Sequence, residues 1–509
     1  MSAGRGIADA IAYVWFWWKM KKLIIILLFA ITLRIVFFVG MGFNDDSSYL
    51  YSANEVYNSK FSVGAGWYSS RIGTYLPIVI MWKLFGVSEL SSSTYFILCS
   101  LIEIISVYFL GKILFSEKVA LLAAFILSVL PIGVIYSTQI GPNVPMCAFF
   151  AMSLAFYVLA HRDESYKYYS LLSGVSCGIG YLCYESIVLM LPCFLIYTVL
   201  NIPRTVKKTV IMFILIVVGF VAIASLRNIY FHHFTGAWFY NEHIISTTLS
   251  NDRNIDDNFF RYPKALFNIG QDFNSWDDPK LFGITYYIVI LSLIVLLLMN
   301  KLFNKNVLFI VISMLFIFLT FQYFLHFLSL SIAPQFWRAR HSRYLIAMSM
   351  PASLIIAYAC SCMRGKMAWV GIGAIICLFI SSMYYGYNNH KFLRNGMGYV
   401  RETTYVLQRM PEKKIYIPDN WTESKMRVFA KFDKHFLSRL VIYQDAKFDV
   451  NRIKDSYIVT NINPYTYICR MNYPPFMANP PQKWKLVKTI KMDNYGIFTK
   501  FEPRIYSCQ

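Results

Sequence analysis

Charged residues are scarce in this sequence of 509 residues: Asp, Glu, Lys and Arg make up 15% of the chain, whereas hydrophobic residues make up 57%. Soluble globular proteins carry about 25% charged residues, so this composition excludes a soluble protein. The charges stand in short stretches between apolar runs of roughly the 20 residues that a helix needs to cross a bilayer. The sequence therefore predicts a polytopic α-helical membrane protein.

Two other features are missing, a metal-binding spacing and an internal repeat. No arrangement of Cys or His resembles a metal site, and eight of the ten cysteines lie in or beside apolar runs, where a thiol packs as a small hydrophobic side chain. Cys469 and Cys508 fall in a polar region, where they either stay free or form a disulfide in an oxidising compartment. The inverted repeats of many secondary transporters are not visible.

Eleven apolar segments have the length and composition of membrane-spanning helices. The first follows three lysines and lacks a small-residue cleavage pattern, so we expect it to be retained as a helix. The segment Ile72 to Phe85 is shorter and contains Pro77 and Lys83, which favours a re-entrant or interfacial helix. The predicted spans lie at about 23–40, 91–111, 119–138, 144–160, 168–183, 186–201, 209–229, 282–300, 306–330, 344–362 and 367–385.

The distribution of Lys and Arg predicts the orientation of these spans, because short cytoplasmic loops carry the excess of positive charge. Basic residues occupy alternate short connections, such as the one with Lys207 and Lys208 and the one with Arg364 and Lys366. These connections and the N-terminus are therefore expected in the cytoplasm. With an odd number of spans, loops at about 41–90 and 231–281 and the C-terminal region face outward.

The composition changes near residue 388, where mixed charge, proline clusters and short alternating runs begin. We expect a transmembrane domain over 1–387 and a small soluble α/β domain over 388–509. The second region carries 21 Lys and Arg against 10 Asp and Glu. This surplus suits anionic lipid headgroups or phosphate-bearing glycans, and a general solubilising role is the alternative.

Asp45 and Asp46 directly follow the first predicted span, on the outer face in this topology. Neighbouring carboxylates suit deprotonation of a hydroxyl, since one acts as the base while the other holds the acceptor or raises the basicity of the first. The same residues could instead cap a helix over Ser47 to Asn58 or bind a divalent cation. Position alone leaves these alternatives open.

A basic cluster lies between the ninth and tenth predicted spans. Guanidinium groups bind phosphate oxygens through paired hydrogen bonds, so the cluster suits a lipid phosphate or diphosphate, with headgroup anchoring as the alternative. We favour phosphate binding, because a basic cluster on the outer face runs against the charge bias there. Its candidate residues are Arg338, Arg340, His341, Arg343 and Tyr344.

Three ionisable residues fall within or between apolar segments: Arg34 in the first span, Glu103 in the second, and Glu185 where the fifth and sixth meet. Charges inside a membrane usually face a cavity or a partner. Arg34 therefore either pairs with Glu103 or extends to the membrane surface. Glu185 is expected near the outer surface, on the same side as Asp45.

Taken together, these features resemble the GT-C glycosyltransferases, in particular the branch with protein O-mannosyltransferases and bacterial aminoarabinose transferases. That family shows an Arg in the first helix, then an acidic pair, a Tyr and an Ala in the first outer loop; these correspond to Arg34, Asp45, Asp46, Tyr49 and Ala53. Three further segments fit the family: Arg71 to Pro77 with a following Phe-Gly pair, Gly111 to Phe115, and Arg343-Tyr344 followed by Pro351.

Two positions depart from the family pattern. Many members have an Asp after the third helix, where this chain has Asn143, and Asn cannot act as a base. Many have a Lys at the outer end of the fifth helix, where this chain has Tyr184 and Glu185, which removes a cation. Both departures bear on the donor or the acceptor rather than on the fold.

The resemblance implies a transferase that moves a hexosyl or pentosyl group from a polyprenyl-phosphate carrier to an acceptor hydroxyl on the outer face, with inversion. It implies Asp45 as the general base and Asp46 as the residue that orients the acceptor or the base. Arg340 and Arg343, with Arg71, would bind the departing lipid phosphate. The candidate substrate-binding residues are Tyr49, Arg71, Asn143, Glu185, Arg338, Arg340, His341, Arg343 and Tyr344.

The expected partners are the lipid-linked sugar donor, the bilayer, and an acceptor that is a glycan, a lipid or a protein; no nucleic acid is expected. No cofactor is required, because the phosphate leaving group already carries its own charge, although a divalent cation remains compatible with the acidic pair. The family branch places the protein in a bacterial inner membrane, with the C-terminal domain in the periplasm.

Two rival functions stay open. A polymerase or ligase that joins whole lipid-linked glycans would use a catalytic centre in a large outer loop, and the loop at 231–281 is long enough to hold one. A flippase or transporter of lipid-linked glycans would line a path through the membrane with ionisable residues. Arg34 and Glu103 are too few residues to line such a path by themselves, and the acidic pair lies at the surface, so both points weigh against a transporter.

Overall fold

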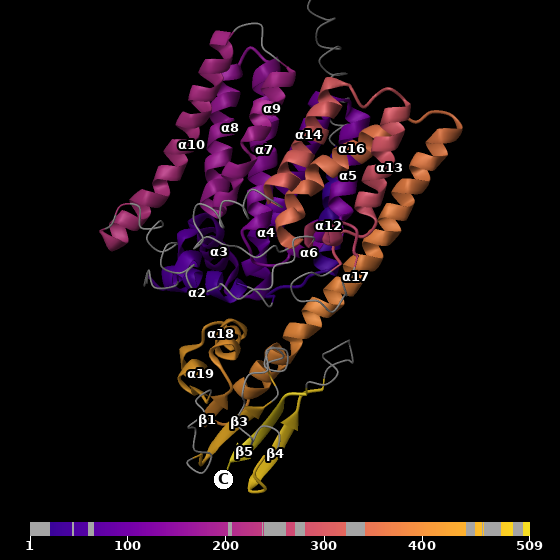
Figure 1. Cartoon of the computed structure of the whole chain (residues 1–509). Helices are drawn as coiled ribbons and strands as arrows, with labels where there is room; N and C mark the ends of the chain where they lie inside the picture. Colours follow the sequence, from indigo (N-terminus) through magenta and orange to yellow (C-terminus); the bar gives the residue numbers. More distant parts are fainter. Residues whose placement is uncertain are drawn as a thin grey trace, which may run out of the picture.

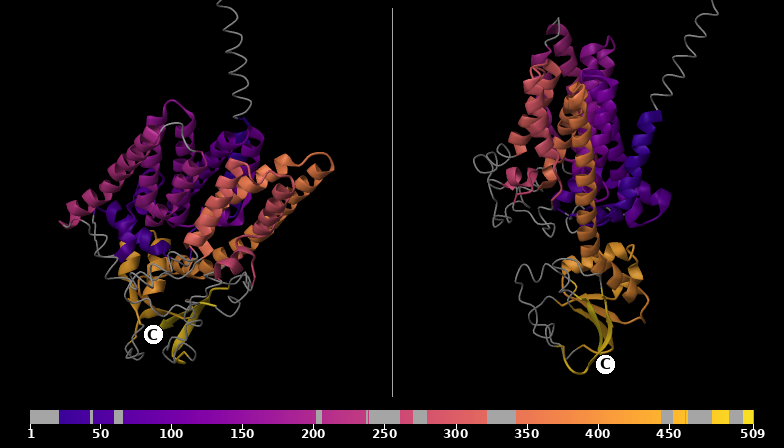
Figure 2. Two further views of the ribbon diagram at one scale, coloured as in Figure 1. Left: turned by 45° about the horizontal axis from the view of Figure 1, so that its top comes forward. Right: turned by 90° about the vertical axis from the view of Figure 1, so that its right-hand side faces the viewer.

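The computed structural model describes residues 21–42, 45–59, 66–201, 206–236, 238, 261–269, 280–321, 342–443, 453–460, 462, 480–491 and 502–508. A bundle of apolar helices makes up most of this part of the chain, and a smaller domain with a β-sheet lies at one end of the bundle (Figure 1). The two further views show the same separation, with one long helix running from the bundle into the smaller domain (Figure 2). The predicted fold class, a helical membrane protein with a small C-terminal α/β domain, is confirmed.

The first half of the bundle begins with a helix over residues 21–36. The elements that follow are α2 (Asp46–Tyr57), η1 (Gly66–Ser70), α3 (Ile72–Phe85), α4 (Glu89–Leu114), α5 (Glu117–Val129), α6 (Pro131–Tyr136), α7 (Asn143–Arg162), α8 (Tyr166–Cys183), η2 (Glu185–Met190), α9 (Pro192–Leu200) and α10 (Val206–Thr235). The second half contains α12 (Arg261–Leu266), α13 (Thr285–Leu298), α14 (Lys305–Leu319), η6 (Ser342–Met348), α16 (Ser349–Cys362) and α17 (Lys366–Gln408).

Each predicted span coincides with helical structure in the described residues. Among those residues, five helices are long and apolar enough to cross a membrane, and four shorter helices are also apolar. The span predicted at 119–138 is divided into α5 and α6, because Pro131 begins α6 and forces Leu130 into an extended conformation. The span predicted at 306–330 is α14 up to Leu319, and its part beyond 321 lies outside the described residues.

The helices α2 and α3 lie at the edge of the bundle that faces the smaller domain (Figure 1). Pro77 is accommodated inside α3. Thr74 donates a hydrogen bond to the carbonyl of Cys183 at 3.1 Å, which ties α3 to the end of α8. Trp82 is fully buried, and its indole donates to Ser92 Oγ at 2.8 Å, which ties α3 to α4. The short apolar segment is therefore fixed between the end of α8 and the start of α4.

The helices α8 and α10 pack unusually closely. A Cβ atom added at Gly174 would lie 2.1 Å from the carbonyl oxygen of Ile216, and one added at Gly219 would lie 2.6 Å from that of Leu171. Small residues allow such close approach between helices in a membrane. This contact holds Arg227, near the end of α10, beside the end of α8.

Arg34 does not extend to the membrane surface. It is 1% exposed, and its guanidinium donates to Ser100 Oγ at 2.7 Å and to the carbonyl of Ala30 at 3.0 Å. Glu103 is also buried and interacts electrostatically with Arg34. Of the two alternatives for Arg34, the interior position is therefore the one that the structure shows.

The C-terminal domain is built on a five-stranded mixed sheet in the order β2-β1-β3-β5-β4. The inner strands β1 and β3 are parallel to each other, as are β1 and β2, whereas β5 is antiparallel to both β3 and β4. The strands are β1 (Lys414–Ile417), β2 (Leu440–Ile442), β3 (Ser456–Thr460), β4 (Trp484–Thr489) and β5 (Arg504–Cys508), with α18 (Asn420–Phe429) and α19 (Lys434–Ser438) between β1 and β2. Cys508 lies in β5, whereas Cys469 lies outside the described residues, so their disulfide stays a prediction.

The domain is attached through α17, which continues from the bundle to within a few residues of β1 (Figure 2). The predicted domain boundary at 387/388 falls inside this helix and stays a prediction. The domain also touches the bundle through α18 and the turn that follows it. Ser424 of α18 donates a hydrogen bond to Ser47 of α2 at 3.4 Å, and the rings of Phe432 and Trp82 lie 5.8 Å apart.

Candidate active site

Asp45 stands at the N-terminal end of α2, just beyond the first helix. Its Oδ1 accepts a hydrogen bond from the Tyr68 hydroxyl at 2.8 Å, and its Oδ2 accepts one from Arg343 Nη2 at 3.3 Å. Burial by itself raises the pKa of Asp45, but the charge of Arg343 and the hydrogen bond from Tyr68 together bring the pKa below its usual value. Asp45 is therefore ionised at neutral pH.

Asp46 has a different environment, although it is the next residue. It is 2% exposed, and its Oδ2 accepts hydrogen bonds from the backbone N–H groups of Gly42 at 2.9 Å and Ile140 at 3.4 Å. Burial raises the pKa of Asp46 above its usual value, and the charge of Lys425 and the hydrogen bond from Gly42 only partly oppose this. Environments that move two pKa values apart are typical of carboxylates with separate roles.

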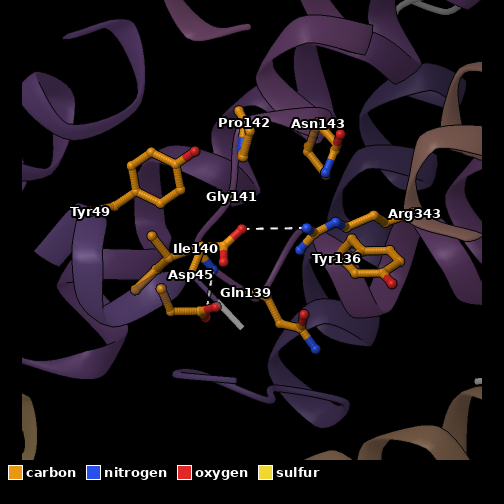
Figure 3. A pocket seen from close by; sticks show the side chains of 11 residues that line it. Asp45, Tyr49, Tyr136, Gln139, Ile140, Gly141, Pro142, Asn143 and Arg343 are labelled. Atoms are coloured by element: carbon orange, nitrogen blue, oxygen red, sulfur yellow. Dashed lines mark hydrogen bonds and ion pairs between the residues drawn. The ribbon is translucent and has the colours of Figure 1, made fainter. Parts of the chain in front are cut away.

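Asp45, Asp46 and Arg343 line one pocket, which occupies about 350 Å³ including the part open to solvent. Its other walls are formed by Tyr49, Tyr136, Gln139 and the segment from Ile140 to Val144 (Figure 3). The pocket therefore joins the start of α2, the turn before α7 and the start of η6.

Two buried polar atoms of this pocket have no hydrogen-bond partner among the described residues. They are Oδ1 of Asn143 and Nε of Arg343. An unpaired acceptor and an unpaired donor in a buried position are costly, unless a ligand or water supplies the missing bond. Because one is an acceptor and the other a charged donor, the pocket can bind a group that offers both a hydroxyl and an anionic oxygen.

A second polar cluster lies beside the pocket and connects to it through Tyr49. Arg71 is 2% exposed, and it donates to the Tyr49 hydroxyl at 2.6 Å and to Glu185 Oε2 at 3.4 Å. Arg227 donates to the other oxygen of Glu185 at 3.3 Å and to the Tyr181 hydroxyl at 2.5 Å. Two arginines thus surround one carboxylate. Positive charge is thus present at Glu185, although the residue itself is acidic.

The aromatic residues between the two clusters are stacked against the arginines. The guanidinium of Arg71 lies 4.3 Å from the ring centroid of Tyr184, and that of Arg343 lies 5.7 Å from that of Tyr344. The rings of Tyr184 and Tyr344 are 6.2 Å apart. This packing holds both planar cations in fixed orientations, which suits recognition of phosphate or carboxylate oxygens.

The predicted site residues are therefore brought together in part. Asp45, Asp46, Tyr49, Asn143 and Arg343 line the pocket, and Arg71, Glu185 and Tyr344 lie next to it. Arg338, Arg340 and His341 lie outside the described residues, as does most of the loop at 231–281. The roles of all these residues stay predictions.

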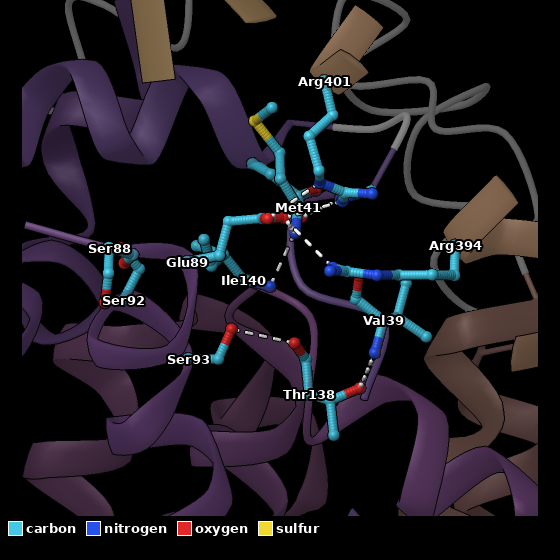
Figure 4. A network of polar contacts seen from close by, with 12 residues as sticks. Val39, Met41, Ser88, Glu89, Ser92, Ser93, Thr138, Ile140, Arg394 and Arg401 are labelled. Carbon is cyan, nitrogen blue, oxygen red and sulfur yellow. Dashed lines mark hydrogen bonds and ion pairs between the residues drawn. The ribbon is translucent and has the colours of Figure 1, made fainter. Parts of the chain in front are cut away.

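Sequence reasoning missed a network that positions the loop before Asp45 (Figure 4). Glu89 accepts two hydrogen bonds from Arg401 at 2.9 Å each, one from Arg394 at 3.4 Å and one from the backbone N–H of Met41 at 3.1 Å. Gly40 has a φ of +76°, and a Cβ there would lie 2.5 Å from Glu89 Oε1. Glycine is therefore required for the loop to lie against this ion pair.

Three further residues of the site were also missed: Tyr68, Arg227 and Lys425. Tyr68 and Lys425 lie in polar segments, where a tyrosine or a lysine is common, so nothing in the sequence marks them as site residues. Arg227 carried a signal, because it is a charged residue near the end of a predicted span, where charges usually face a partner. Arg227 should therefore have been grouped with Arg34, Glu103 and Glu185 as an ionisable residue within an apolar segment.

The described residues contain no group of three or more His, Cys, Asp and Glu side chains that could hold a metal ion. Asp45 and Asp46 are the acidic pair that the sequence offered for a divalent cation. The hydrogen bonds to these two carboxylates come from tyrosine, arginine and backbone N–H donors. The need for a metal stays an open prediction.

Comparisons with known proteins agree with this arrangement. Residues 73–227 match a family model described as dolichyl-phosphate-mannose-protein mannosyltransferase. No curated protein sequence matches the chain significantly. The structure of ArnT from Cupriavidus metallidurans in the apo state is similar with a TM-score of 0.61 and 12% identity, over 96% of this chain and 98% of that chain. ArnT from the same organism bound to undecaprenyl phosphate is similar with a TM-score of 0.56 and 12% identity, over 95% of this chain and 97% of that chain.

The similarity covers the helical bundle and the C-terminal domain together, and it defines the class: the chain has the GT-C fold of polytopic membrane glycosyltransferases. The resemblance expected from the sequence is thereby confirmed. Within that class, the chain is similar to ArnT over nearly its whole length and to the mannosyltransferase family over α3 to α10.

Proposed function

We propose that this protein is an integral-membrane glycosyltransferase that moves a sugar from a polyprenyl-phosphate donor to an acceptor hydroxyl on the outer face of a bacterial inner membrane. The N-terminus lies in the cytoplasm and the C-terminal domain in the periplasm. Asp45 is the general base, and the reaction inverts the configuration at the anomeric carbon. The donor is supported by the binding of undecaprenyl phosphate to ArnT, a protein of the same fold.

One observation carries this proposal: the Asp45 carboxylate and the Arg343 guanidinium line the same pocket and lie 3.3 Å apart (Figure 3). Transfer of a sugar from a phosphate carrier needs both charges. The carboxylate removes a proton from the acceptor hydroxyl, and the cation stabilises the negative charge of the departing phosphate.

The two charges neutralise each other when no substrate is bound. A donor phosphate that binds to Arg343 would weaken its ion pair with Asp45 and thereby raise the basicity of that carboxylate. The unpaired Nε of Arg343 is a further donor for the phosphate oxygens. Donor binding would thus prepare the base.

In the chemical step, the acceptor oxygen forms a bond to the anomeric carbon while the bond from that carbon to the phosphate oxygen breaks. The proton of the acceptor hydroxyl moves to Asp45, and the electron pair leaves with the polyprenyl phosphate. Attack on the side opposite the leaving group inverts the anomeric carbon. No metal is needed, because the phosphate leaves as a stable anion.

The neighbouring residues would position the substrates. Asp46 accepts hydrogen bonds from the backbone N–H groups of Gly42 and Ile140, and Ile140 lines the pocket. Oδ1 of Asn143 is a free acceptor for a sugar or acceptor hydroxyl. Tyr49, Arg71 and Glu185 form a linked chain of contacts beside the base. The remaining candidates for the lipid phosphate are Arg338, Arg340, His341 and Tyr344.

The test is release of polyprenyl phosphate by the purified full chain in nanodiscs, measured with a panel of polyprenyl-phosphate hexoses and pentoses and mixed glycan, lipid and protein acceptors. We expect release by the wild type and loss of release by Asp45→Asn. Glu55→Gln, a carboxylate changed on the same helix but outside the pocket, should retain activity. Donor that is bound but not cleaved by the wild type would overturn the proposal and favour a flippase.

A further inference from the structure

The C-terminal domain places a buried lysine next to the acidic pair. The helix α18 lies directly below α2 in the view of Figure 1, and Ser424 bonds to Ser47 across this contact. The next residue, Lys425, is 1% exposed, and its charge acts on both Asp46 and Asp45. A lysine from the second domain is thus part of the electrostatic environment of the pocket.

Two contacts within the C-terminal domain stabilise the helix that carries Lys425. Asp419 caps its N-terminus by accepting a hydrogen bond from the backbone of Thr422 at 2.7 Å, and Glu423 forms an ion pair with Arg427 at 2.5 Å along the helix. The ring of Trp421 lies 5.8 Å from the Lys425 ammonium. The position of Lys425 therefore follows the position of the whole domain.

A buried ammonium group is unstable unless opposite charges compensate its lost hydration. Asp46 is the first carboxylate that acts on Lys425, and Lys425 is in turn the strongest cation acting on Asp46 among the described residues. Asp45 is balanced differently, because Arg343 and Tyr68 act on it more strongly than Arg71 and Lys425 do. The acidic pair thus has two separate cationic partners, Arg343 from the bundle and Lys425 from the C-terminal domain.

We propose that Lys425 is a positioning residue that keeps Asp46 ionised, so that the acidic pair is complete only when the C-terminal domain is docked on α2. This inference rests on the proposed function. An ionised Asp46 holds the Gly42 and Ile140 backbone and adds negative charge beside Asp45, which makes Asp45 a better base. Docking of the domain would therefore control the activity of a site that lies in the bundle.

The first experiment measures transfer rates against pH for the full chain in nanodiscs, with a donor that the wild type cleaves. Lys425→Met removes the charge but keeps the length of the side chain, and Lys434→Met removes an exposed lysine of the same domain as the matched control. We expect kcat of Lys425→Met to fall about tenfold to a hundredfold near neutral pH. Lys434→Met should behave as the wild type.

The pH profile separates an electrostatic role from a merely structural one. The groups that face the acidic pair are Arg343, Arg71 and Tyr68 from the bundle and Lys425 from the domain. Without Lys425, the pKa of Asp46 rises further, so the acidic limb of the rate profile should move to higher pH. Since burial lowers the pKa of Lys425 to about 8, the wild-type rate should also fall above that pH, and this limb should be missing in Lys425→Met. An unchanged profile would overturn the inference.

A second measurement does not depend on activity. The melting temperatures of Asp46→Asn, Lys425→Met and the double variant form a double-mutant cycle. We expect the double variant to be more stable than the sum of the single effects predicts, because each single change leaves one buried charge without its partner. Additive effects would show that the two residues do not interact, even if no donor is cleaved and the proposed function fails.

A cross-link tests whether the docked form is the active one. Ser47→Cys with Ser424→Cys replaces two hydroxyls that are 3.4 Å apart. After oxidation, the linked protein should keep the activity of its reduced form. The wild type, oxidised and reduced under the same conditions, is the control. Loss of activity on cross-linking, reversed by reduction, would show that the domain has to leave α2 during turnover and would overturn the inference.

Discussion

Two carboxylates near the same loop, Asp45 and Glu89, both pair with arginine but differ in how completely they are satisfied. Glu89 accepts four hydrogen bonds, from two arginines and one backbone N–H, and its side chain is 15% exposed. Asp45 accepts two, from Tyr68 and Arg343, and its side chain is 27% exposed and lines a pocket.

This difference indicates that the ion pair of Glu89 stabilises the fold, whereas the ion pair of Asp45 is available for catalysis. A carboxylate that accepts four hydrogen bonds has little capacity left for a substrate, but it fixes the segments that surround it. Glu89 joins the start of α4, the loop at Met41 and the C-terminal half of α17, which carries Arg394 and Arg401. Asp45 keeps free acceptor capacity and a partner that a phosphate can take over.

The largest effect is expected for Asp45→Asn. The change keeps the size of the side chain and its ability to accept a hydrogen bond from Tyr68, but it removes the base. Transfer should fall about 100- to 10,000-fold, while the melting temperature should stay close to that of the wild type. A large loss of stability with little loss of rate would reverse the roles assigned to Asp45 and Glu89.

Arg343→Met should have the next largest effect, a fall of roughly 100-fold in kcat, because the departing phosphate loses its cation. The pKa of Asp45 should also rise, since Arg343 is the strongest group that lowers it. Asp45 works in its ionised form, which is present above its pKa, so the acidic limb of the rate profile should move to higher pH. Arg394→Met removes an arginine from the Glu89 network instead, and it should leave this limb in place.

Glu89→Gln should act mainly on stability. Removal of the charge leaves Arg401, which is buried, without its bidentate partner and weakens the contact with Met41. The free energy of unfolding should fall by on the order of 3 kcal/mol, seen as a lower melting temperature in detergent. The rate per folded molecule should fall less than about tenfold, and a loss as large as that of Asp45→Asn would mean that Glu89 itself takes part in the reaction.

The smallest effect is expected for Tyr68→Phe, which removes one hydrogen bond from Asp45 without removing a charge. The Tyr68 hydroxyl helps to lower the pKa of Asp45, so its loss should move the acidic limb of the rate profile to higher pH, by less than Arg343→Met does. The rate at neutral pH should change by less than about tenfold. Tyr57→Phe, a change at an exposed tyrosine of α2, is the matched control.

Much of the fold could be predicted from the sequence, because the length and hydrophobicity of a single segment are enough to predict a membrane-spanning helix. The eleven apolar segments coincide with helical structure. The segment Ile72 to Phe85, predicted as a shorter helix that contains Pro77, is helical as well. The short alternating runs expected after residue 388 include the strands β1 and β3. The boundary at 387/388 followed the loss of hydrophobicity, whereas α17 continues past it as a single helix.

The candidate site could be predicted only where its residues carry chemistry in a short motif. Asp45, Asp46 and Arg343 stood out by charge and position, and the structure places them around one pocket. Lys425 and Glu89 did not stand out, because each is an ordinary charged residue in its own segment. Only their neighbours in space give them a role.

The sequence by itself determined the membrane-spanning segments and the acidic pair at the end of the first one, since hydrophobic length and local charge need no partner. Only the tertiary structure decided which carboxylate is fully satisfied and which stays open to substrate. Asp45 and Arg343 are 298 positions apart, and Glu89 and Arg401 are 312 apart. Contacts at such separations depend on how the helices pack against one another, and that packing is a property of the whole chain rather than of any one segment.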